Sequence, residues 1–175
     1  MLDYELISER RIRRELQKFN HRNLSIFFDL RPNVEMELHS LKGRRIDLRL
    51  SFLKRNSIVE IKELSEDINS YIHQFLPDKK IEINFELLIF NSYPFKPIQW
   101  KIKSKICQGF SKEEEKNILT FIEYKLYLHN RRGKDLIPRR KMNWSPVTTI
   151  QKDILLFYIK IDSIFDMINK LDGLN

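Results

Sequence analysis

The chain of 175 residues is 42% hydrophobic and 32% charged, which fits one domain with a buried core and excludes a disordered tail. No apolar run approaches the ~20 residues of a membrane-spanning helix, so we expect no membrane insertion. The net charge of +8 suits nucleic acid, an acidic protein or an anionic surface as a partner, although 24 acidic residues among 32 basic ones also fit an ordinary solvated surface.

The first predicted elements are a basic helix and a β-hairpin. Apolar residues at helical spacing predict a helix over residues 4–20. The opposite face of this helix carries four arginines, which are Arg10, Arg11, Arg13 and Arg14. Alternating apolar residues over 34–38 and 46–52 then predict two strands, which Gly43 joins in a turn.

The next segment changes its periodicity within a few residues. The sequence Ser-Ile-Val-Glu-Ile-Lys-Glu at 57–63 favours a third strand or an extension of the second. Over residues 63–76 the apolar side chains return to helical spacing, and Pro77 ends the pattern. We therefore expect a peripheral helix over 63–76.

Two further strands flank a proline corner. Clean alternation predicts strands over 81–90 and 98–104, which we expect to be neighbours in the sheet. Between them Pro94 and Pro97 lack the N–H group that a central strand needs, so the chain must turn stiffly there.

Helices are predicted to complete the chain. Ser111, followed by three glutamates that suit the helix dipole, predicts the start of a helix over 111–128. A basic segment follows, and the residues from Trp144 onward predict a long closing helix. The order of helix, antiparallel strands and helices predicts an α+β fold, in which helices cover one face or one end of a sheet.

The amino-acid usage bears on the origin of the protein. A single cysteine cannot form an internal disulfide and the acidic first residues do not form a secretory signal, so we expect an intracellular, reducing compartment. The chain has no alanine and only four glycines, whereas Ile, Asn, Lys and Phe abound. Because the abundant residues have AT-rich codons, we expect an AT-rich genome, such as that of a virus, an organelle or a parasite.

This order of elements resembles the ubiquitin-conjugating enzyme (UBC-like) fold. Two segments carry the resemblance behind an Arg-Ile-Arg-Arg-Glu-Leu helix, and their residues are Tyr93, Pro94, Phe95, Lys96 and Pro97 of the corner and Trp144, Ser145 and Pro146 of a later Trp-Ser-Pro segment. The family's corner ends in a second proline, which is Ile98 here. The resemblance implies one UBC-like domain over 1–175, a meander of four or more strands, and insertions at about 53–78 and 110–128.

The family's nucleophile is missing at the matching position. Ubiquitin-conjugating enzymes carry ubiquitin as a thioester on a cysteine, because a thiolate is both a good nucleophile and a good leaving group. Eight residues before Trp144, where the family has this cysteine, the chain has Leu136, three residues after Gly133. The family's His-Pro-Asn triplet, whose asparagine supports the oxyanion, is absent as well. The resemblance therefore implies a catalytically inactive relative.

Cys107 is the one alternative nucleophile, since the chain has no other cysteine. A lone cysteine at the end of a strand is more often a small buried apolar residue. No glycine-rich phosphate loop occurs, and the histidines lack the spacing of metal ligands, so we expect no cofactor and no metal. The four histidines are His21, His39, His73 and His129.

A basic segment occupies the part of the chain that would hold the family's cysteine. Its bases are Arg131, Arg132, Lys134, Arg139, Arg140 and Lys141, with Asp135 as the one acidic residue among them. Such a cluster of like charges favours contact with an acidic protein or a polyanion such as RNA.

Two functions remain open from the sequence. The first is a non-catalytic UBC-like subunit that binds protein partners, RNA or ubiquitin within a larger assembly through its basic surfaces. The second is a divergent ubiquitin-conjugating enzyme that uses Cys107. Tyr93 and Trp144 have a structural interpretation as core-capping residues and a functional one as a partner surface, and the structural interpretation is favoured.

Overall fold

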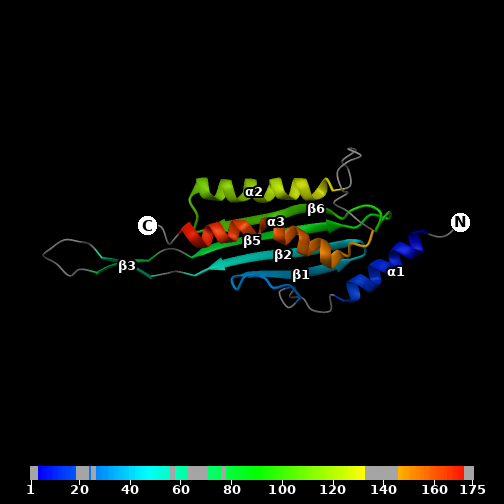
Figure 1. Cartoon of the computed structure of the whole chain (residues 1–175), viewed down its shortest axis with the longest axis horizontal. Helices are drawn as coiled ribbons and strands as arrows, with labels where there is room; N and C mark the ends of the chain where they lie inside the picture. Colours follow the sequence, from blue (N-terminus) through cyan, green and yellow to red (C-terminus); the bar gives the residue numbers. More distant parts are fainter. Residues whose placement is uncertain are drawn as a thin grey trace.

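A computed structural model describes residues 4–18, 24, 27–55, 58–62, 71–75, 78–132 and 146–171. Within them the protein is α+β, with three helices, a four-stranded antiparallel sheet and a separate two-stranded ribbon (Figure 1). In chain order the elements are α1 (Tyr4–Gln17), β1 (Val34–Lys42), β2 (Arg45–Lys54), β3 (Ile58–Lys62), β4 (Tyr71–Phe75), β5 (Lys79–Leu88), β6 (Gln99–Gln108), α2 (Lys112–Asn130) and α3 (Ile150–Leu171). The α+β fold class is confirmed.

The main sheet is an antiparallel meander in the order β1-β2-β5-β6. Its register places apolar residues opposite one another, with Leu38 beside Leu48, Leu48 beside Phe85, and Phe85 beside Ile102. Because side chains alternate along each strand, this register gathers every buried residue of β1, β2 and β5 on one face. The prediction that 81–90 and 98–104 form neighbouring strands is confirmed.

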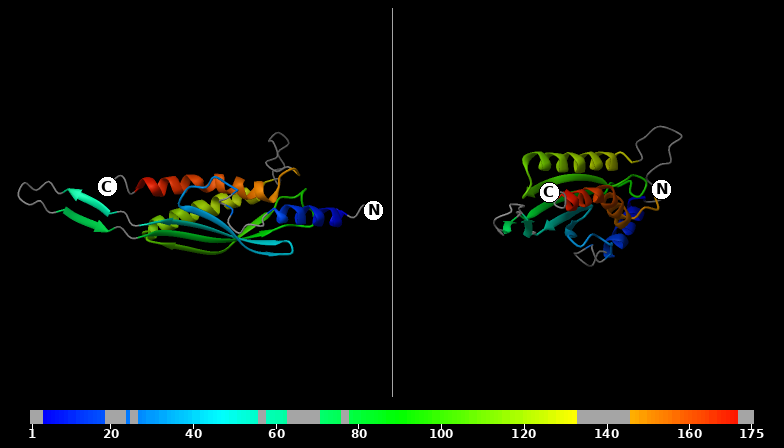
Figure 2. Two further views of the ribbon diagram at one scale, coloured as in Figure 1. Left: turned by 90° about the horizontal axis from the view of Figure 1, so that it is seen from below. Right: turned by 60° about the vertical axis from the view of Figure 1, so that its left-hand side comes forward.

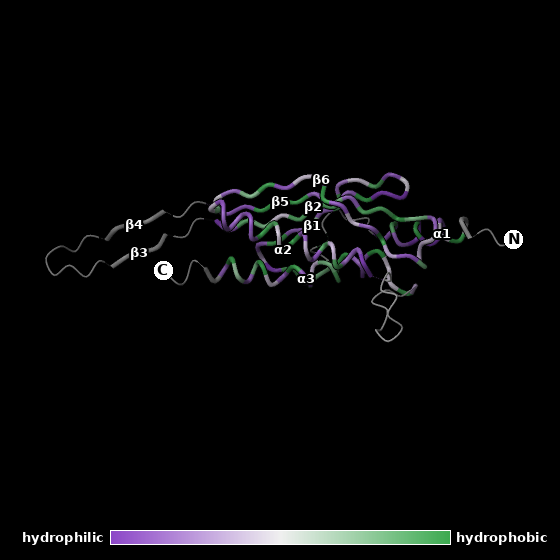
Figure 3. The backbone as a smooth tube through the Cα atoms, turned by 90° about the horizontal axis from the view of Figure 1, so that it is seen from above, coloured by the Kyte–Doolittle hydropathy of each residue, from purple (hydrophilic) through white to green (hydrophobic). Residues whose placement is uncertain are grey.

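Helices α2 and α3 lie side by side on this apolar face of the sheet (Figure 2). The rings of α3 pack directly on those of the strands, with centroid distances of 5.2 Å from Phe52 to Phe165 and 5.4 Å from Phe85 to Phe157. Burying one such side chain stabilises a fold by roughly 1.5–3 kcal/mol. The alternation of hydrophobic and hydrophilic residues along the strands and α3 is visible in Figure 3.

The opposite face of the sheet carries charged residues of both signs. Arg49 forms an ion pair with Glu37 across β1 and β2, and Lys103 Nζ lies 3.1 Å from a carboxylate oxygen of Asp47. Such cross-strand pairs compensate one another's charge. The net positive charge of the chain is therefore not concentrated on this face.

The predicted helix over 111–128 is confirmed as α2. Ser111 and Glu114 form a reciprocal capping box, in which the Ser111 hydroxyl accepts from the Glu114 N–H and the Glu114 carboxylate accepts from the Ser111 N–H. The helix packs through four buried residues, which are Ile118, Ile122, Leu126 and His129.

The predicted helix over 63–76 is wrong over Tyr71–Phe75, whereas residues 63–70 and 76 lie outside the described part of the chain. Residues Tyr71–Phe75 form strand β4, which pairs with β3 in an antiparallel register that places Ile61 opposite Ile72. This ribbon extends past one end of the main sheet (Figure 1). The spacing of the apolar residues alone suggested a helix. The segment forms a strand instead because it pairs with the preceding strand Ile58–Lys62, and β-branched and aromatic residues favour strands. The predicted third strand at 57–63 is confirmed.

The first and last helices begin and end within a few residues of the predictions. The helix expected over 4–20 is α1, which spans Tyr4–Gln17 and lies at the end of the sheet opposite the ribbon (Figure 1). The closing helix begins at Ile150, later than the prediction from Trp144. Trp144 itself lies outside the described residues. No helix of the described part of the chain is long and apolar enough to cross a membrane.

Candidate functional site

The proline corner is a tight turn anchored by a buried tyrosine. Tyr93 is only 1% exposed, and its hydroxyl donates to Glu15 Oε2 at 2.6 Å. The backbone turns through bonds from the Tyr93 N–H to the Phe90 carbonyl and from the Phe95 N–H to the Ser92 carbonyl. Burial and the nearby Glu15 carboxylate raise the pKa of Tyr93, so the hydroxyl keeps its proton. The structural interpretation of Tyr93 therefore fits its surroundings.

Glu15 joins three segments that are far apart in the chain. One carboxylate oxygen accepts from Arg11 Nε at 2.7 Å, and the other accepts from Tyr93 and from the Ile150 N–H at 2.8 Å. Ile150 is the first residue of α3, where a negative charge favourably meets the helix dipole. The carboxylate thus binds α1, the corner and α3 to one another.

Phe95 points away from this network. Its side chain is 67% exposed, although the corner that carries it is fixed by the buried Tyr93, Pro94 and Pro97. Other exposed apolar side chains lie on the segments that meet at this end of the molecule, namely Ile7, Phe90 and Val147. Large exposed apolar side chains are candidates for contact with a partner. We call Ile7, Phe90, Phe95 and Val147 the corner surface.

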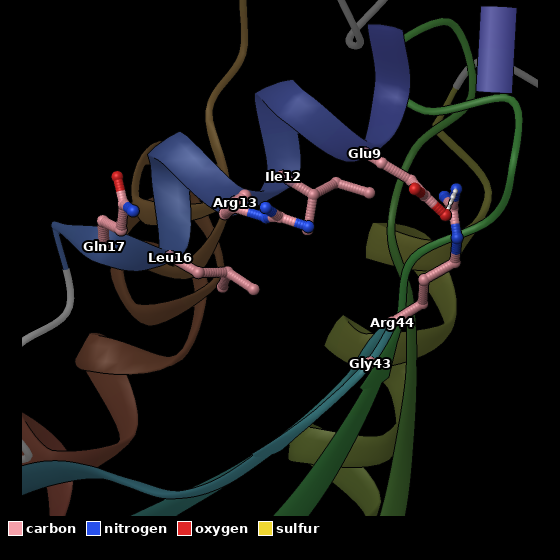
Figure 4. A pocket seen from close by; sticks show the side chains of 7 residues that line it. All are labelled: Glu9, Ile12, Arg13, Leu16, Gln17, Gly43 and Arg44. Atoms are coloured by element: carbon pink, nitrogen blue, oxygen red, sulfur yellow. Dashed lines mark ion pairs between the residues drawn. The ribbon is translucent and has the colours of Figure 1, made fainter. Parts of the chain in front are cut away.

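A cavity of about 500 Å³ lies between α1 and the turn that joins β1 and β2 (Figure 4). Its lining residues are Glu9, Ile12, Arg13, Leu16 and Gln17 of α1 and Gly43 and Arg44 of the turn. Glu9 and Arg44 approach one another across it at 3.7 Å. The cavity combines an apolar wall with guanidinium groups, which suits an apolar residue beside a carboxylate.

The four arginines predicted as a basic helix face divide into two groups. Arg10, Arg13 and Arg14 are exposed. Arg11 is half-buried, because it pairs with Glu15 and its guanidinium lies 5.4 Å from the centre of the Tyr93 ring. Arg11 therefore helps to hold the corner, whereas the other three can meet a partner.

Cys107 sits near the end of β6, opposite Ile81, and is half-buried. Burial, followed by the charge of Glu115, raises the pKa of its thiol to about 11. Almost all of the thiol is then protonated near neutral pH, where only the thiolate is a nucleophile. The structure gives Cys107 the surroundings of a packed apolar residue.

A buried polar cluster lies where α2 ends. The carboxylate of Asp153 accepts from Trp100 Nε1 at 2.9 Å, forms an ion pair with Arg132 and lies 3.3 Å from His129 Nε2. Burial lowers the pKa of His129 to about 4, so its ring is neutral at pH 7. Burial would raise the pKa of Asp153, but the neighbouring His129 and Arg132 outweigh it and hold that pKa below its usual range.

Arg132 is consequently a poor candidate for a contact residue. Its side chain is buried against Asp153 because an unpaired buried carboxylate would be very costly. The sequence prediction grouped Arg132 with surface bases, since Asp153 lies 21 residues away in the chain and no local pattern links the two. Arg131 is exposed and lies over the Tyr127 ring.

Several predicted site residues lie outside the described part of the chain. They are the bases Lys134, Arg139, Arg140 and Lys141, the family position Leu136, and Trp144 and Ser145. Pro146 is described and exposed. Among the described residues no group of three or more His, Cys, Asp or Glu side chains could hold a metal ion.

Comparisons of the chain with models of known protein families, with curated protein sequences and with solved structures found no significant match.

Proposed function

We propose that the protein is a non-catalytic UBC-like subunit that binds a protein partner through the corner surface. The observation that carries the proposal is Phe95, a large apolar side chain that is 67% exposed on a turn fixed by the buried Tyr93. An exposed aromatic residue on a pre-ordered backbone is a typical anchor of protein interfaces, because little conformational freedom is lost when a partner covers it.

The positive charge of α1 favours an acidic partner. The exposed bases Arg10, Arg13 and Arg14 of α1 lie at the same end of the molecule as the corner. Positive charge beside an apolar anchor favours an acidic partner by steering its approach and fixing its orientation. The cavity between α1 and the turn at Gly43 offers a second point of contact for an apolar residue next to a carboxylate.

Leu136 and Cys107 both favour a function without catalysis. On the UBC-like resemblance the family's cysteine position is Leu136, which cannot form a thioester. The raised pKa of Cys107 disfavours the alternative, a divergent conjugating enzyme that uses this thiol.

Site-specific photo-cross-linking tests the proposal. A photoreactive phenylalanine analogue replaces Phe95 in one sample and the exposed Leu53 of β2 in the control. In an extract of the native source, position 95 should cross-link one acidic protein and position 53 should not. Charge-reversed Arg13→Glu should weaken that cross-link. Equal labelling at both positions, or none at position 95, would show that the corner surface is not an interface.

A further inference from the structure

The cavity between α1 and the β1–β2 turn, which we call the α1 cavity, is lined by more positive than negative charge. Two guanidinium groups, from Arg13 and Arg44, and one carboxylate, from Glu9, give its lining a net charge of +1. The apolar part of the lining comes from Ile12, which belongs to the core, and from Leu16, which is partly buried against it. A volume of about 500 Å³ lies within the range of small-molecule sites.

The guanidinium of Arg44 has a donor nitrogen without an acceptor. Its Nη1 atom donates to the Ser8 hydroxyl at 3.3 Å and to the Phe90 carbonyl at 3.2 Å. Its Nη2 atom is buried and has no hydrogen-bond partner among the described residues. Glu9 Oε1 lies 3.7 Å from this nitrogen, which is too far for a hydrogen bond (Figure 4). A carboxylate that comes closer than Glu9 would therefore satisfy a donor that the fold leaves unsatisfied.

Arg13 supplies the second guanidinium of the α1 cavity. It is exposed, and Glu9, one turn earlier on α1, is paired with Arg44 instead. The Glu9 side chain is itself 54% exposed, so it can turn into solvent without leaving its charge buried. A guanidinium presents parallel N–H donors that match both oxygens of a carboxylate. The lining thus offers a place for a carboxylate directly beside an apolar wall.

We propose that the α1 cavity binds an apolar carboxylate, which is an organic acid whose carboxylate is attached directly to an apolar body. The carboxylate lies between Arg13 and Arg44 in place of Glu9, and the apolar body lies against Leu16 and Gly43. A Cβ atom at Gly43 would meet nothing within 4 Å, so there is open space beside the turn. This proposal names a ligand for the cavity and does not depend on the corner surface, so the two proposals can fail separately.

The lining disfavours other classes of ligand. A neutral apolar molecule would leave Arg44 Nη2 without an acceptor, and a cation would be repelled by both guanidinium groups. An inorganic anion would satisfy the donors but would leave the apolar wall at Leu16 uncovered. An apolar carboxylate uses both parts of the lining. Two sources present this chemistry, a free fatty acid and the C-terminal residue of a protein chain that ends in an apolar side chain.

A chemical-shift titration of the isotope-labelled full chain with octanoate tests the proposal, and the amide of Gly43 reports on binding because Gly43 lines the cavity. Each methylene group that becomes buried strengthens binding about fourfold, so octanoate should bind about fifteenfold more tightly than hexanoate. Octylammonium and 1-octanol have the same apolar body without the carboxylate, and they should bind at least about tenfold more weakly than octanoate.

Arg13→Gln should weaken octanoate binding by about tenfold, because it removes a charged hydrogen-bond donor from the cavity. The matched control is Arg14→Gln, which removes an exposed arginine of α1 that does not line the cavity and should leave the affinity unchanged.

Glu9→Gln should have the opposite effect and strengthen octanoate binding, since it removes the carboxylate that competes for Arg44. Its control is Glu113→Gln on α2, which changes the net charge by the same amount at a distant exposed position and should leave the affinity unchanged. Equal effects of the two substitutions would mean that octanoate responds only to the net charge of the protein.

A dipeptide distinguishes the two sources of the ligand. N-acetyl-glycyl-leucine with a free carboxylate is compared with its C-terminal amide and with octanoate. Tighter binding of the dipeptide acid assigns the cavity to the end of a partner chain, and tighter binding of octanoate assigns it to a free fatty acid. The amide should bind more weakly than the acid in both cases, because it lacks the charge that the guanidinium groups recognise.

Three results would overturn the proposal. They are a Gly43 amide that does not shift with octanoate, octylammonium that binds as tightly as octanoate, and equal affinities of Arg13→Gln and Arg14→Gln. Circular dichroism confirms that each variant is folded, which we expect because Glu9, Arg13 and Arg14 are exposed. None of these results changes the expected cross-link at position 95.

Discussion

The Tyr93 hydroxyl donates to Glu15 at 2.6 Å, across 78 residues of sequence. The same carboxylate oxygen accepts from the first N–H of α3, at Ile150. Removing Glu15 would therefore remove direct hydrogen bonds from α1 to the corner and to the start of α3. This arrangement connects the stability of the fold with the geometry of the proposed binding surface.

We expect Tyr93→Phe to lower the free energy of unfolding by about 1.5–3 kcal/mol, because it removes a buried hydrogen bond to a charged group. Urea denaturation measures the change. Tyr124→Phe makes the same chemical change at an exposed position and should stay within about 0.5 kcal/mol of the wild type. Equal effects of the two substitutions would contradict the role given to the Tyr93–Glu15 bond.

We expect Cys107 to react slowly with iodoacetamide at pH 8. Its pKa of about 11 lies two units above the ordinary value of 9.0, so about a hundredfold less thiolate is present, and the rate should rise about tenfold per pH unit up to pH 10. Mass spectrometry of the alkylated chain measures the rate.

For the same reason, incubation with an activating enzyme, ATP and ubiquitin should give no reductant-sensitive adduct. An adduct that disappears in Cys107→Ser would instead establish the divergent conjugating enzyme.

The buried His129 should make stability fall in acid. Its pKa is about 4 in the folded protein and 6.5 as an ordinary value, so between these pH values the unfolded chain binds a proton that the folded protein does not. The free energy of unfolding should therefore decrease by about 3 kcal/mol as the pH falls from 6.5 to 4.

His129→Gln removes this titration and should flatten the pH dependence over that window, measured by urea denaturation at a series of pH values. The exposed His39 supplies the control, and His39→Gln should keep the wild-type slope. A His129→Gln profile as steep as that of the wild type would assign the acid sensitivity to other groups.

Two glycines provide a matched pair for backbone substitution. Both adopt positive φ, 59° at Gly43 and 79° at Gly109. A Cβ atom at Gly43 would meet nothing within 4 Å, whereas one at Gly109 would lie 2.0 Å from the Asp78 carbonyl oxygen. Gly43→Ala should therefore cost about 1 kcal/mol, the price of the left-handed conformation, and Gly109→Ala several times more. Thermal unfolding of both variants measures the difference, and equal costs would contradict the close approach at Asp78.

Local patterns in the sequence predicted the elements whose stability is largely local. Strict alternation predicted β1, β2 and β5, because only one face of each strand can be buried. Ser111 and the three glutamates after it predicted the start of α2, since the bonds that cap this helix lie within its first turn. The two prolines predicted the corner between β5 and β6, because each lacks a donor.

Tertiary structure decided which charged and aromatic residues serve the core and which remain available. Arg132 is buried in an ion pair with Asp153, whereas the adjacent Arg131 is exposed and lies over the Tyr127 ring. Tyr93 and Phe95 belong to one corner, yet only Phe95 is open to a partner. The spacing of residues in the sequence does not predict which of these side chains is buried, because burial and ion pairing depend on residues that folding brings from distant positions.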